Sequence, residues 1–222
     1  MSRVTPIDRI AERERMVAEQ IVARGIRDPR VLAALRTVPR ELFVPAAAQD
    51  LAYDDRPLSI GDGQTISQPY IVAITLASLG LAGTERVLEI GTGSGYVAAL
   101  LTLLARRGEV YSIERLSSLA RSAQARLESC GYPVHVKDGD GTLGWPEHAP
   151  FDAIAVSAAG PYVPEALLEQ TAPGGRVVIP VRRGSRQVLL RVIRMPGDGV
   201  QMEPIEDVCF VPLIGAQGEP ER

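Results

Sequence analysis

The apolar residues in the middle of the chain predict two buried strands joined by a glycine turn and a helix. Residues 87–90 (VLEI) form a short, mostly apolar run, as in a parallel strand that is covered on both faces. The glycine-rich segment 91–95 (GTGSG) follows, and the apolar residues 96–104 then predict a helix that ends near a glycine. Residues 110–113 predict the second strand, and Glu114 stands at its end.

This order of elements predicts a unit that binds a nucleoside. Glycines permit positive φ angles and let backbone amides approach a ligand closely, and the start of the helix presents unpaired N–H groups. Glu114, at the tip of the second strand, can accept hydrogen bonds from both hydroxyls of a ribose. The dinucleotide pattern G-x-G-x-x-G is not met, because Tyr96 stands at its sixth position.

The first sixty residues predict a helical layer in front of this unit. Residues 7–24 have helical periodicity, with apolar residues near one face. Asp28-Pro29 is typical of the N-cap and first position of a second helix, which Pro39 interrupts. Residues 53–67 are rich in Asp, Pro and Gly, so we expect turns there without regular structure. The helices of this layer are expected to serve packing.

Residues 64–70 (QTISQPY) predict the start of another helix directly before the glycine unit. Pro69 suits its first turn, Ser67 or Gln68 suits its N-cap, and Gly80 suits its end. The free amides at such a start favour an ionised carboxylate as ligand. Ser67 is therefore either a simple cap or a group that acts on this carboxylate, and the residues alone leave both open.

The second half of the chain alternates strands and helices, as in an α/β protein. Residues 116–130 predict an amphipathic helix and 134–136 a strand, which runs into Asp138-Gly139-Asp140-Gly141. An acid at this strand end can accept a hydrogen bond from an adenine amino group, and the Gly141 amide is available to a ring nitrogen. Further strands are predicted at 151–157, 175–181, 187–195 and 200–213, with a helix at 163–170, a hairpin turn at 197–199 and a polar, frayed tail from 217.

Composition narrows the class of protein. The 222 residues and the hydrophobic fraction of 45% suit one globular domain. Cys130 and Cys209 have no metal or disulfide spacing, and neither a membrane span nor a secretory signal is visible, so we expect a reduced cytoplasmic protein. A net charge of −3 without a basic stripe argues against a nucleic-acid partner. His135 and His148 have no neighbour at metal-ligand spacing, so no metal is expected.

Two motifs resemble those of known methyltransferases. The pattern E-x-G-x-G-x-G at 89–95 resembles the first motif of the S-adenosylmethionine-dependent methyltransferases. Residues 63–69 (GQTISQP) resemble the signature of the protein-L-isoaspartate O-methyltransferase family, and T-I-S-x-P is the element that separates this family from other methyltransferases. The similarity continues at 112–115, 139–145, 150–154, 173–176 and 210–213, so that it spans residues 15–214.

The resemblance implies an α/β fold with a doubly wound, mostly parallel seven-stranded sheet and an N-terminal helical layer. Within a single methyltransferase domain, it implies a cap region at 1–60, a catalytic core at 61–214 and a flexible tail at 215–222. It implies S-adenosyl-L-methionine as cofactor, with S-adenosyl-L-homocysteine as product, and no metal. The implied partners are isoaspartyl-containing proteins and peptides, met by a cytoplasmic monomer without a nucleic acid or a membrane.

The matched motifs also imply the residues of the site. Glu89 would face the ammonium group of the cofactor, directly or through water, and Ser67 is the expected catalytic residue, which holds the acceptor carboxylate. The implied cofactor contacts are Thr65, Ile66, Ser67, Val72, Glu89, Ile90, Gly91, Thr92, Gly93, Gly95, Tyr96, Glu114, Arg115, Asp140 and Gly141. The implied acceptor contacts are Thr65, Ser67, Gln68, Val211, Pro212 and Leu213, the last three through the backbone of a strand end.

The implied reaction is in-line displacement of the sulfonium methyl group by the α-carboxylate of an L-isoaspartyl residue. The ester then cyclises to a succinimide, and hydrolysis returns some normal aspartate. A carboxylate is ionised near neutral pH, so this chemistry requires no general base. The small residues at 157–160 replace the Asn/Asp-Pro-Pro-aromatic segment of enzymes that methylate base amino groups, which argues against a nucleobase acceptor.

Three alternatives stay open. The acceptor could be another carboxylate, such as that of a biosynthetic peptide. The chain could also bind the cofactor without catalysis, although its acids and Ser67 argue against this. An NAD-dependent dehydrogenase is the third alternative, and it would be stabilised by a nicotinamide cofactor instead of S-adenosyl-L-methionine.

Overall fold

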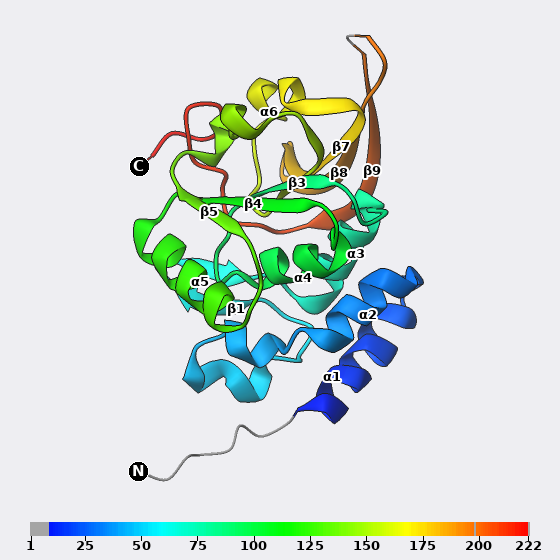
Figure 1. The fold of residues 1–222 in the computed structure, drawn as a ribbon, viewed down its shortest axis with the longest axis vertical. Helices are drawn as coiled ribbons and strands as arrows, with labels where there is room; N and C mark the ends of the chain where they lie inside the picture. Colours follow the sequence, from blue (N-terminus) through cyan, green and yellow to red (C-terminus); the bar gives the residue numbers. More distant parts are fainter. Residues whose placement is uncertain (1–8, 198, 222) are drawn as a thin grey trace.

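A seven-stranded sheet forms the centre of the computed structural model, which describes residues 9–197 and 199–221 (Figure 1). Across the sheet the strands follow the order β5-β4-β3-β6-β7-β8-β9. Four neighbouring pairs are parallel, and the pairs β7–β8 and β8–β9 are antiparallel. The bounds are Arg86–Ile90 for β3, Glu109–Glu114 for β4, His135–Asp138 for β5, Phe151–Val156 for β6, Thr171–Arg183 for β7, Arg186–Arg194 for β8 and Val200–Val208 for β9. The predicted doubly wound, mostly parallel sheet is confirmed.

The central strand β3 lies where the topology of the sheet reverses. It pairs with β4 on one side and with β6 on the other, because the chain first builds outward to β5 and then crosses back. β3 is buried on both faces, since Val87 belongs to one hydrophobic core and Leu88 and Ile90 to the other. Ligands of open α/β sheets bind beyond the carboxyl ends of the strands at such a reversal. The glycine segment 91–95 follows β3 at this point.

Helices cover both faces of the sheet. α3 (Pro69–Leu79), α4 (Tyr96–Leu104) and α5 (Ser117–Ser129) lie on one face, below the sheet in Figure 1, and α6 (Glu165–Glu169) lies on the other. As predicted, α3 begins at a proline and ends at Gly80, which adopts the left-handed conformation with φ 56°. No helix within the described ranges is both long and apolar enough to cross a membrane.

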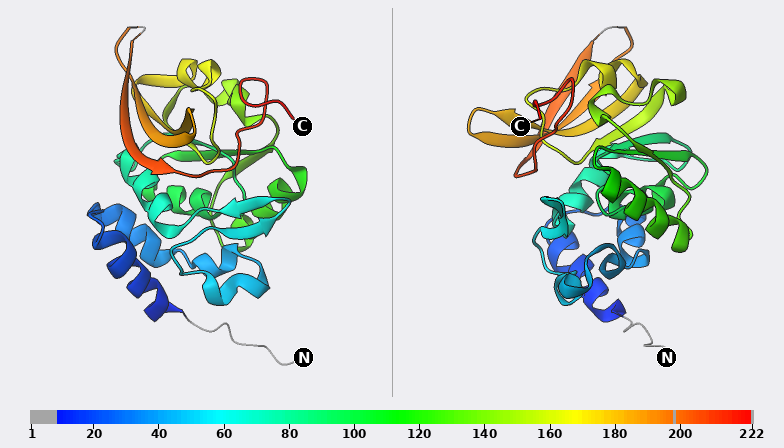
Figure 2. Two further views of the ribbon diagram at one scale, coloured as in Figure 1. Left: turned by 180° about the vertical axis from the view of Figure 1, so that it is seen from behind. Right: turned by 90° about the vertical axis from the view of Figure 1, so that its left-hand side faces the viewer.

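The N-terminal layer packs against the outer side of α3 and α4 (Figure 2). α1 (Ile10–Met16) continues into the π-helical turns Val17–Val22, and α2 (Pro29–Thr37) is followed by short 3-10 turns at Arg40–Phe43 and Ala46–Leu51. Asp28 caps α2 by accepting a hydrogen bond from the Arg30 amide at 2.9 Å, as its position before a proline predicted. Ile7, predicted to start the first helix, lies outside the described residues.

A β-hairpin stands where we predicted turns without regular structure. β1 (Leu58–Gly61) pairs with β2 (Gln64–Ile66) in an antiparallel ribbon. Its turn needs left-handed backbone at Asp62, with φ 50°, and at the glycines on either side. The strands are too short to show a periodic pattern, so only the turn residues were visible in the sequence. Ile60 packs on the glycine turn after β3, where a Cβ on Gly93 would lie 3.3 Å from its Cδ1.

The C-terminal segment also differs from its prediction. β9 ends at Val208, before the predicted end at 213, because the chain then leaves β8 and crosses the end of the sheet to bridge Pro212 with Ala159. The tail after 214 is not free: the Glu219 amide donates to the Leu213 carbonyl at 2.7 Å, and the Glu219 carboxylate pairs with an arginine of β7. The predicted hairpin turn at 197–199 contains Asp198, which lies outside the described residues.

Candidate active site

Three adjoining cavities open at the carboxyl ends of β3, β4 and β6. The strand-end cavity lies between the tips of β3 and β4 and the crossing segment 211–214. The inner cavity lies between the glycine turn 91–94 and residues 65–67. The outer cleft, with a volume of about 700 Å³, lies between the loop before α3 and residues 206–211. Thr65 and Ser157 line all three, so the cavities meet between β2 and the end of β6.

Bare backbone forms two walls of the strand-end cavity. Gly91 and Gly93 line one wall, and the Gly91 amide donates to the Ile113 carbonyl at 2.8 Å, which ties the turn to β4. Gly141 lines the other wall and lies against Ile90, where a Cβ would come within 2.4 Å of Cγ2. Side chains at these positions would fill the cavity or displace its walls, so the glycines let a ligand contact backbone amides.

Glu89 is a fully buried carboxylate with one unpartnered oxygen. Its Oε2 accepts a hydrogen bond from the Ser112 hydroxyl, which lies 2.6 Å from the hydroxyl of Thr92. Its Oε1 has no hydrogen-bond partner among the residues that the structure describes, and Glu89 lines the inner cavity. Burial raises the pKa of Glu89 to about 8. A ligand cation in the inner cavity would supply the missing partner, so this carboxylate fits an ammonium group.

Glu114 holds the glycine turn from the tip of β4. Its Oε2 accepts from the Gly93 amide at 2.9 Å, and its Oε1 accepts from the Leu116 amide at 3.0 Å. Glu114 is only 7% exposed and lines the strand-end cavity. An ionised carboxylate offers about four acceptor positions, so each oxygen retains capacity for a ribose hydroxyl. Glu114 stands at the end of β4 as expected, its contact with a ribose stays a prediction, and its bonds to the turn were not predicted.

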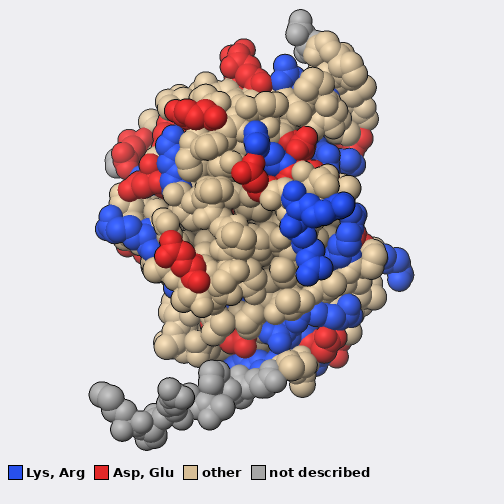
Figure 3. Space-filling view, viewed as in Figure 1, with Lys and Arg blue, Asp and Glu red and all other residues tan. Residues whose placement is uncertain are grey.

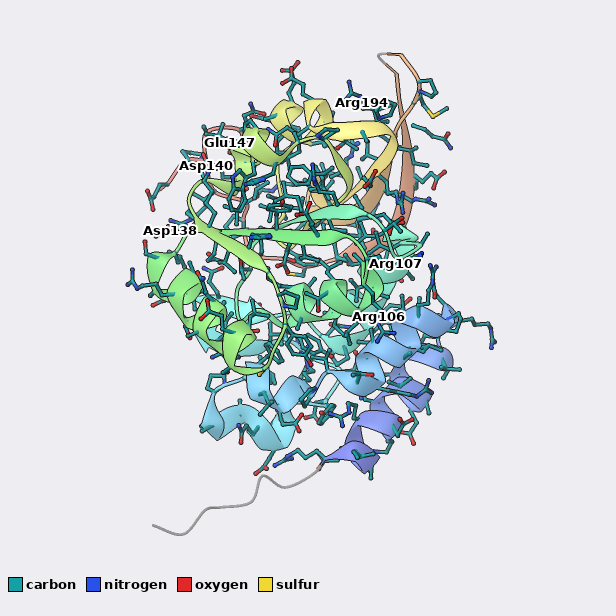
Figure 4. The ribbon with its side chains drawn as sticks, in the orientation of Figure 1. Arg106, Arg107, Asp138, Asp140, Glu147 and Arg194 are labelled. Atoms are coloured by element: carbon teal, nitrogen blue, oxygen red, sulfur yellow. The ribbon has the colours of Figure 1, made fainter. Side chains whose placement is uncertain are left out.

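Asp140, which is predicted to accept a hydrogen bond from an adenine amino group, is engaged within the chain. Its Oδ1 accepts from the amide and the hydroxyl of Thr142 at 2.8 and 2.7 Å, and its Oδ2 accepts from the Ala216 amide at 2.7 Å. Figure 4 shows Asp140 beyond the end of β5, close to the C-terminal segment. Asp140 lines none of the three cavities, whereas Gly141 does. One acceptor position of Oδ2 is left for a ligand.

A side chain of the protein already binds one of the free amides at the start of α3. Gln68 is the N-cap residue, and its side chain makes no capping hydrogen bond. The Tyr70 amide donates instead to Asp55 Oδ1 at 3.2 Å, so this acid takes the place predicted for a ligand carboxylate. Ser67 precedes the N-cap and lines both the inner cavity and the outer cleft. The interpretation of Ser67 as a simple helix cap is therefore wrong.

The crossing segment after β9 has less free backbone than predicted. The Ala159 amide donates to the Val211 carbonyl and the Leu213 amide donates to the Ala159 carbonyl, both at 2.8 Å. The Leu213 carbonyl accepts from the tail, so in the described part of the chain the Val211 amide and the Pro212 carbonyl are the groups of this stretch that remain available to an acceptor peptide. Val211 borders both the strand-end cavity and the outer cleft, whereas Pro212 and Leu213 border only the former.

The remaining predicted residues divide between the cavities and the core. Val72, a residue of α3, is 2% exposed, packs in the core and lines none of the three cavities, so its cofactor contact stays a prediction that these cavities do not support. Gly95 also lines none of them; it starts α4, where a Cβ would lie 3.2 Å from Leu127. Ile66, Thr92 and Tyr96 line the inner cavity, Ile90 and Arg115 the strand-end cavity, and Gln68 the outer cleft.

Ser157 is the main cavity residue that the sequence did not single out. It follows β6, and its amide donates to the Ile90 carbonyl at 2.8 Å, which places it directly beside the glycine turn. The sequence could have indicated Ser157 by its position directly after the fourth parallel strand, because strands on both sides of a topological reversal contribute residues to the same crevice. Within the described residues no group of three His, Cys, Asp or Glu side chains could hold a metal ion.

Comparison with known proteins agrees with this geometry. The family profile described as "Protein-L-isoaspartate(D-aspartate) O-methyltransferase (PCMT)" matches residues 11–218. Protein-L-isoaspartate O-methyltransferase 2 of Pelobacter propionicus is 58% identical over 208 residues, which cover 93% of this chain and 92% of the relative. Protein-L-isoaspartate O-methyltransferase 1 of Rhodopseudomonas palustris is 58% identical over 210 residues, which cover 94% of this chain and 85% of the relative.

Solved structures give the same result. A protein-L-isoaspartate O-methyltransferase aligns with a TM-score of 0.85 and 29% identity over 93% of this chain and 67% of that one. A Plasmodium falciparum protein described as a protein-L-isoaspartate O-methyltransferase, in complex with S-adenosyl-L-homocysteine, aligns with a TM-score of 0.80 and 25% identity over 91% of this chain and 98% of that one.

Proposed function

The chain belongs to the protein-L-isoaspartate O-methyltransferase family, and we propose that it methylates the α-carboxylate of L-isoaspartyl residues in damaged proteins and peptides. The observation that carries the proposal is the meeting of three cavities at Thr65 and Ser157. One cavity is bordered by the nucleoside-binding elements, one by the unpartnered oxygen of Glu89, and one is an open cleft for the acceptor.

The residues of the first two cavities fit S-adenosyl-L-methionine, which supplies an electrophilic methyl group on a sulfonium. Glu89 Oε1 would receive the ammonium group and thereby gain the partner it lacks. Glu114 retains acceptor positions for the ribose hydroxyls while it holds the Gly93 amide. The Gly141 amide, which lines the strand-end cavity, would serve the adenine edge, and an adenine contact of Asp140 would need the acceptor position left on its Oδ2.

The outer cleft receives the acceptor peptide. Ser67 and Thr65 stand where this cleft meets the inner cavity, so their hydroxyls can orient a carboxylate toward the methyl group. No histidine lines any of the three cavities, and none is needed, because the acceptor is already ionised near neutral pH. The protein contributes alignment to about 3–3.5 Å and the exclusion of water.

The finer features of the proposal concern partners and location. We propose a cytoplasmic monomer that acts on isoaspartyl proteins and peptides without a nucleic acid or a membrane. The face shown in Figure 3 carries acidic side chains beside basic ones, apart from a basic cluster at its right, and the net charge of −3 supports a protein acceptor over a polyanion. The second candidate function is transfer to the carboxylate of a dedicated biosynthetic peptide, which the same cleft would admit.

Methyl transfer to matched peptides tests the proposal. Two synthetic peptides differ only in an isoaspartyl or aspartyl linkage, and base-labile methyl esters are counted after reaction with labelled S-adenosyl-L-methionine. We expect esters on the isoaspartyl peptide alone. Ser67→Ala should lower turnover with cofactor affinity retained, whereas the matched control Ser59→Ala, at an exposed residue of the hairpin that precedes Ser67, should behave as the wild type.

Equal labelling of both peptides would refute isoaspartyl specificity and favour the second candidate. Binding of the cofactor without any methyl transfer would refute the enzyme assignment. Thermal stabilisation by a nicotinamide cofactor in place of S-adenosyl-L-methionine would favour a dehydrogenase.

A further inference from the structure

Arg40 is a fully buried cation beneath the active site. It is the largest side chain among the fully buried residues, with no exposed surface, and it lies in the 3-10 turn that follows α2. Within the described residues no carboxylate forms an ion pair with it, and its Nη1 has no hydrogen-bond partner. Burial lowers the pKa of its guanidinium group. An apolar side chain of similar volume would fill the site without this desolvation cost, so packing alone does not explain a cation here.

The guanidinium contacts three segments that are separate in sequence. Its Nε donates to the Ala52 carbonyl and its Nη2 donates to the Ser67 carbonyl, both at 2.7 Å. Its central carbon lies 4.9 Å from the centre of the Tyr96 ring. Tyr96 is the first residue of α4, directly after the glycine turn, and lines the inner cavity together with Ser67. One rigid group thus connects the acceptor loop with the far end of the turn.

The Ser67 loop has few other restraints. β2 ends at Ile66 and α3 begins at Pro69, so Ser67 belongs to neither element. The Ser67 carbonyl makes no other hydrogen bond in the described part of the chain, and no side chain of the loop caps α3. The glycine turn is held independently, through Glu114 and the Ile113 carbonyl. The position of Ser67 relative to the turn therefore depends on Arg40.

We infer that Arg40 is a positioning residue, which sets the distance between Ser67 and the glycine turn and so aligns the acceptor with the methyl donor. The inference rests on the proposed function, because alignment is the main task of the protein in this reaction. A charged, planar fork can hold two carbonyls in fixed directions. Lysine keeps the charge but cannot reproduce this fork, and methionine keeps only the volume.

The test compares Arg40→Lys and Arg40→Met with Tyr53→Phe. Tyr53 lies in the same layer and its hydroxyl contacts Glu41, so this control loosens the layer without touching Ser67. We expect kcat to fall by about 100-fold in Arg40→Met, as for a misplacement of about 1 Å, and by less in Arg40→Lys. The Kd of S-adenosyl-L-homocysteine should change by less than about threefold, because the turn is anchored elsewhere. Tyr53→Phe should keep the wild-type kcat.

Hydrogen exchange supplies a readout that does not depend on turnover. In both Arg40 variants, amides of residues 64–68 should exchange faster, while those of β3 keep their protection. If Arg40→Lys keeps the wild-type kcat, or if its amides at residues 64–68 exchange as slowly as in the wild type, the inference is overturned. Arg40→Lys is the milder substitution, so it provides the test if Arg40→Met does not fold. If kcat and cofactor affinity fall together in all three variants, the inference is also overturned, since such a result would show a general loosening of the N-terminal layer.

The proposed function and the positioning role can fail separately. If wild-type protein does not methylate isoaspartyl peptides but the Arg40 variants release residues 64–68, the proposed acceptor is wrong and the positioning role holds. If the wild type is active and the Arg40 variants retain both kcat and slow exchange, the positioning role is wrong and the proposed function holds.

Discussion

The buried carboxylate of Glu89 should make cofactor affinity depend on pH. Its pKa of about 8 means that it is mostly protonated at neutral pH in the free protein. A bound ammonium group requires the ionised form, so binding includes the free energy of removing this proton. Each pH unit below the pKa adds about 1.4 kcal/mol. This amounts to about 3.4 kcal/mol at pH 5.5 and about 0.8 kcal/mol at pH 7.5.

The dissociation constant of S-adenosyl-L-homocysteine should therefore fall by about 75-fold between pH 5.5 and 7.5. Isothermal titration calorimetry measures it, and titrations in buffers of different ionisation enthalpy count the released proton. Glu89→Gln should remove the pH dependence and approach the wild-type affinity at pH 5.5, where the wild-type carboxyl group is also neutral. Glu109→Gln, at the exposed start of the neighbouring strand β4, is the matched control and should keep the slope.

The raised pKa of Glu89 also predicts how the stability of the free protein changes with pH. Between the unfolded pKa of about 4.5 and the folded pKa of about 8, the folded state binds the additional proton, so the free energy of unfolding of the free protein should fall as pH rises through this window. Glu89→Gln should remove that part of the slope. A dissociation constant that changes by less than twofold from pH 5.5 to 7.5, with no proton released, would show that Glu89 is already ionised or does not face the ammonium group.

Two further variants test the walls of the strand-end cavity, and a third tests the attachment of the C-terminal segment. Glu114→Ala should weaken cofactor binding by more than about 1 kcal/mol, because the ribose hydroxyls lose their acceptor. Calorimetry measures this loss, with Glu109→Ala as the control. Equal cofactor affinities of the two variants would show that Glu114 does not bind the cofactor. Gly141→Ala should lower the free energy of unfolding, measured with urea, by about 1–3 kcal/mol, since the added methyl group meets the Ile90 side chain at 2.4 Å. The control Gly139→Ala, whose added methyl group has its nearest neighbour at 3.8 Å, should leave this free energy nearly unchanged. Asp140→Ala should free the C-terminal segment and speed its removal by carboxypeptidase, and an unchanged rate would show that other bonds hold the tail.

The central unit could be predicted from the sequence because its signals are local. The apolar run of β3, the glycines behind it and the apolar stretch of α4 each depend on neighbouring residues, and the structure has them within one or two residues of the predicted bounds. The same holds for Asp28 as a cap and Gly80 as a helix end, since capping is decided within a single turn.

The placement of polar groups was decided by the tertiary structure. Asp140 was assigned to an adenine from its motif, yet Ala216, 76 residues away, occupies one of its oxygens. The Ser67 carbonyl finds Arg40 across 27 residues, and Asp55 takes the helix start that seemed free for a ligand. The periodicity of a strand or helix is repeated along the chain and can be read from it. A hydrogen-bonding group has many possible partners of equal chemistry, and only the packed fold determines which one comes within 3 Å.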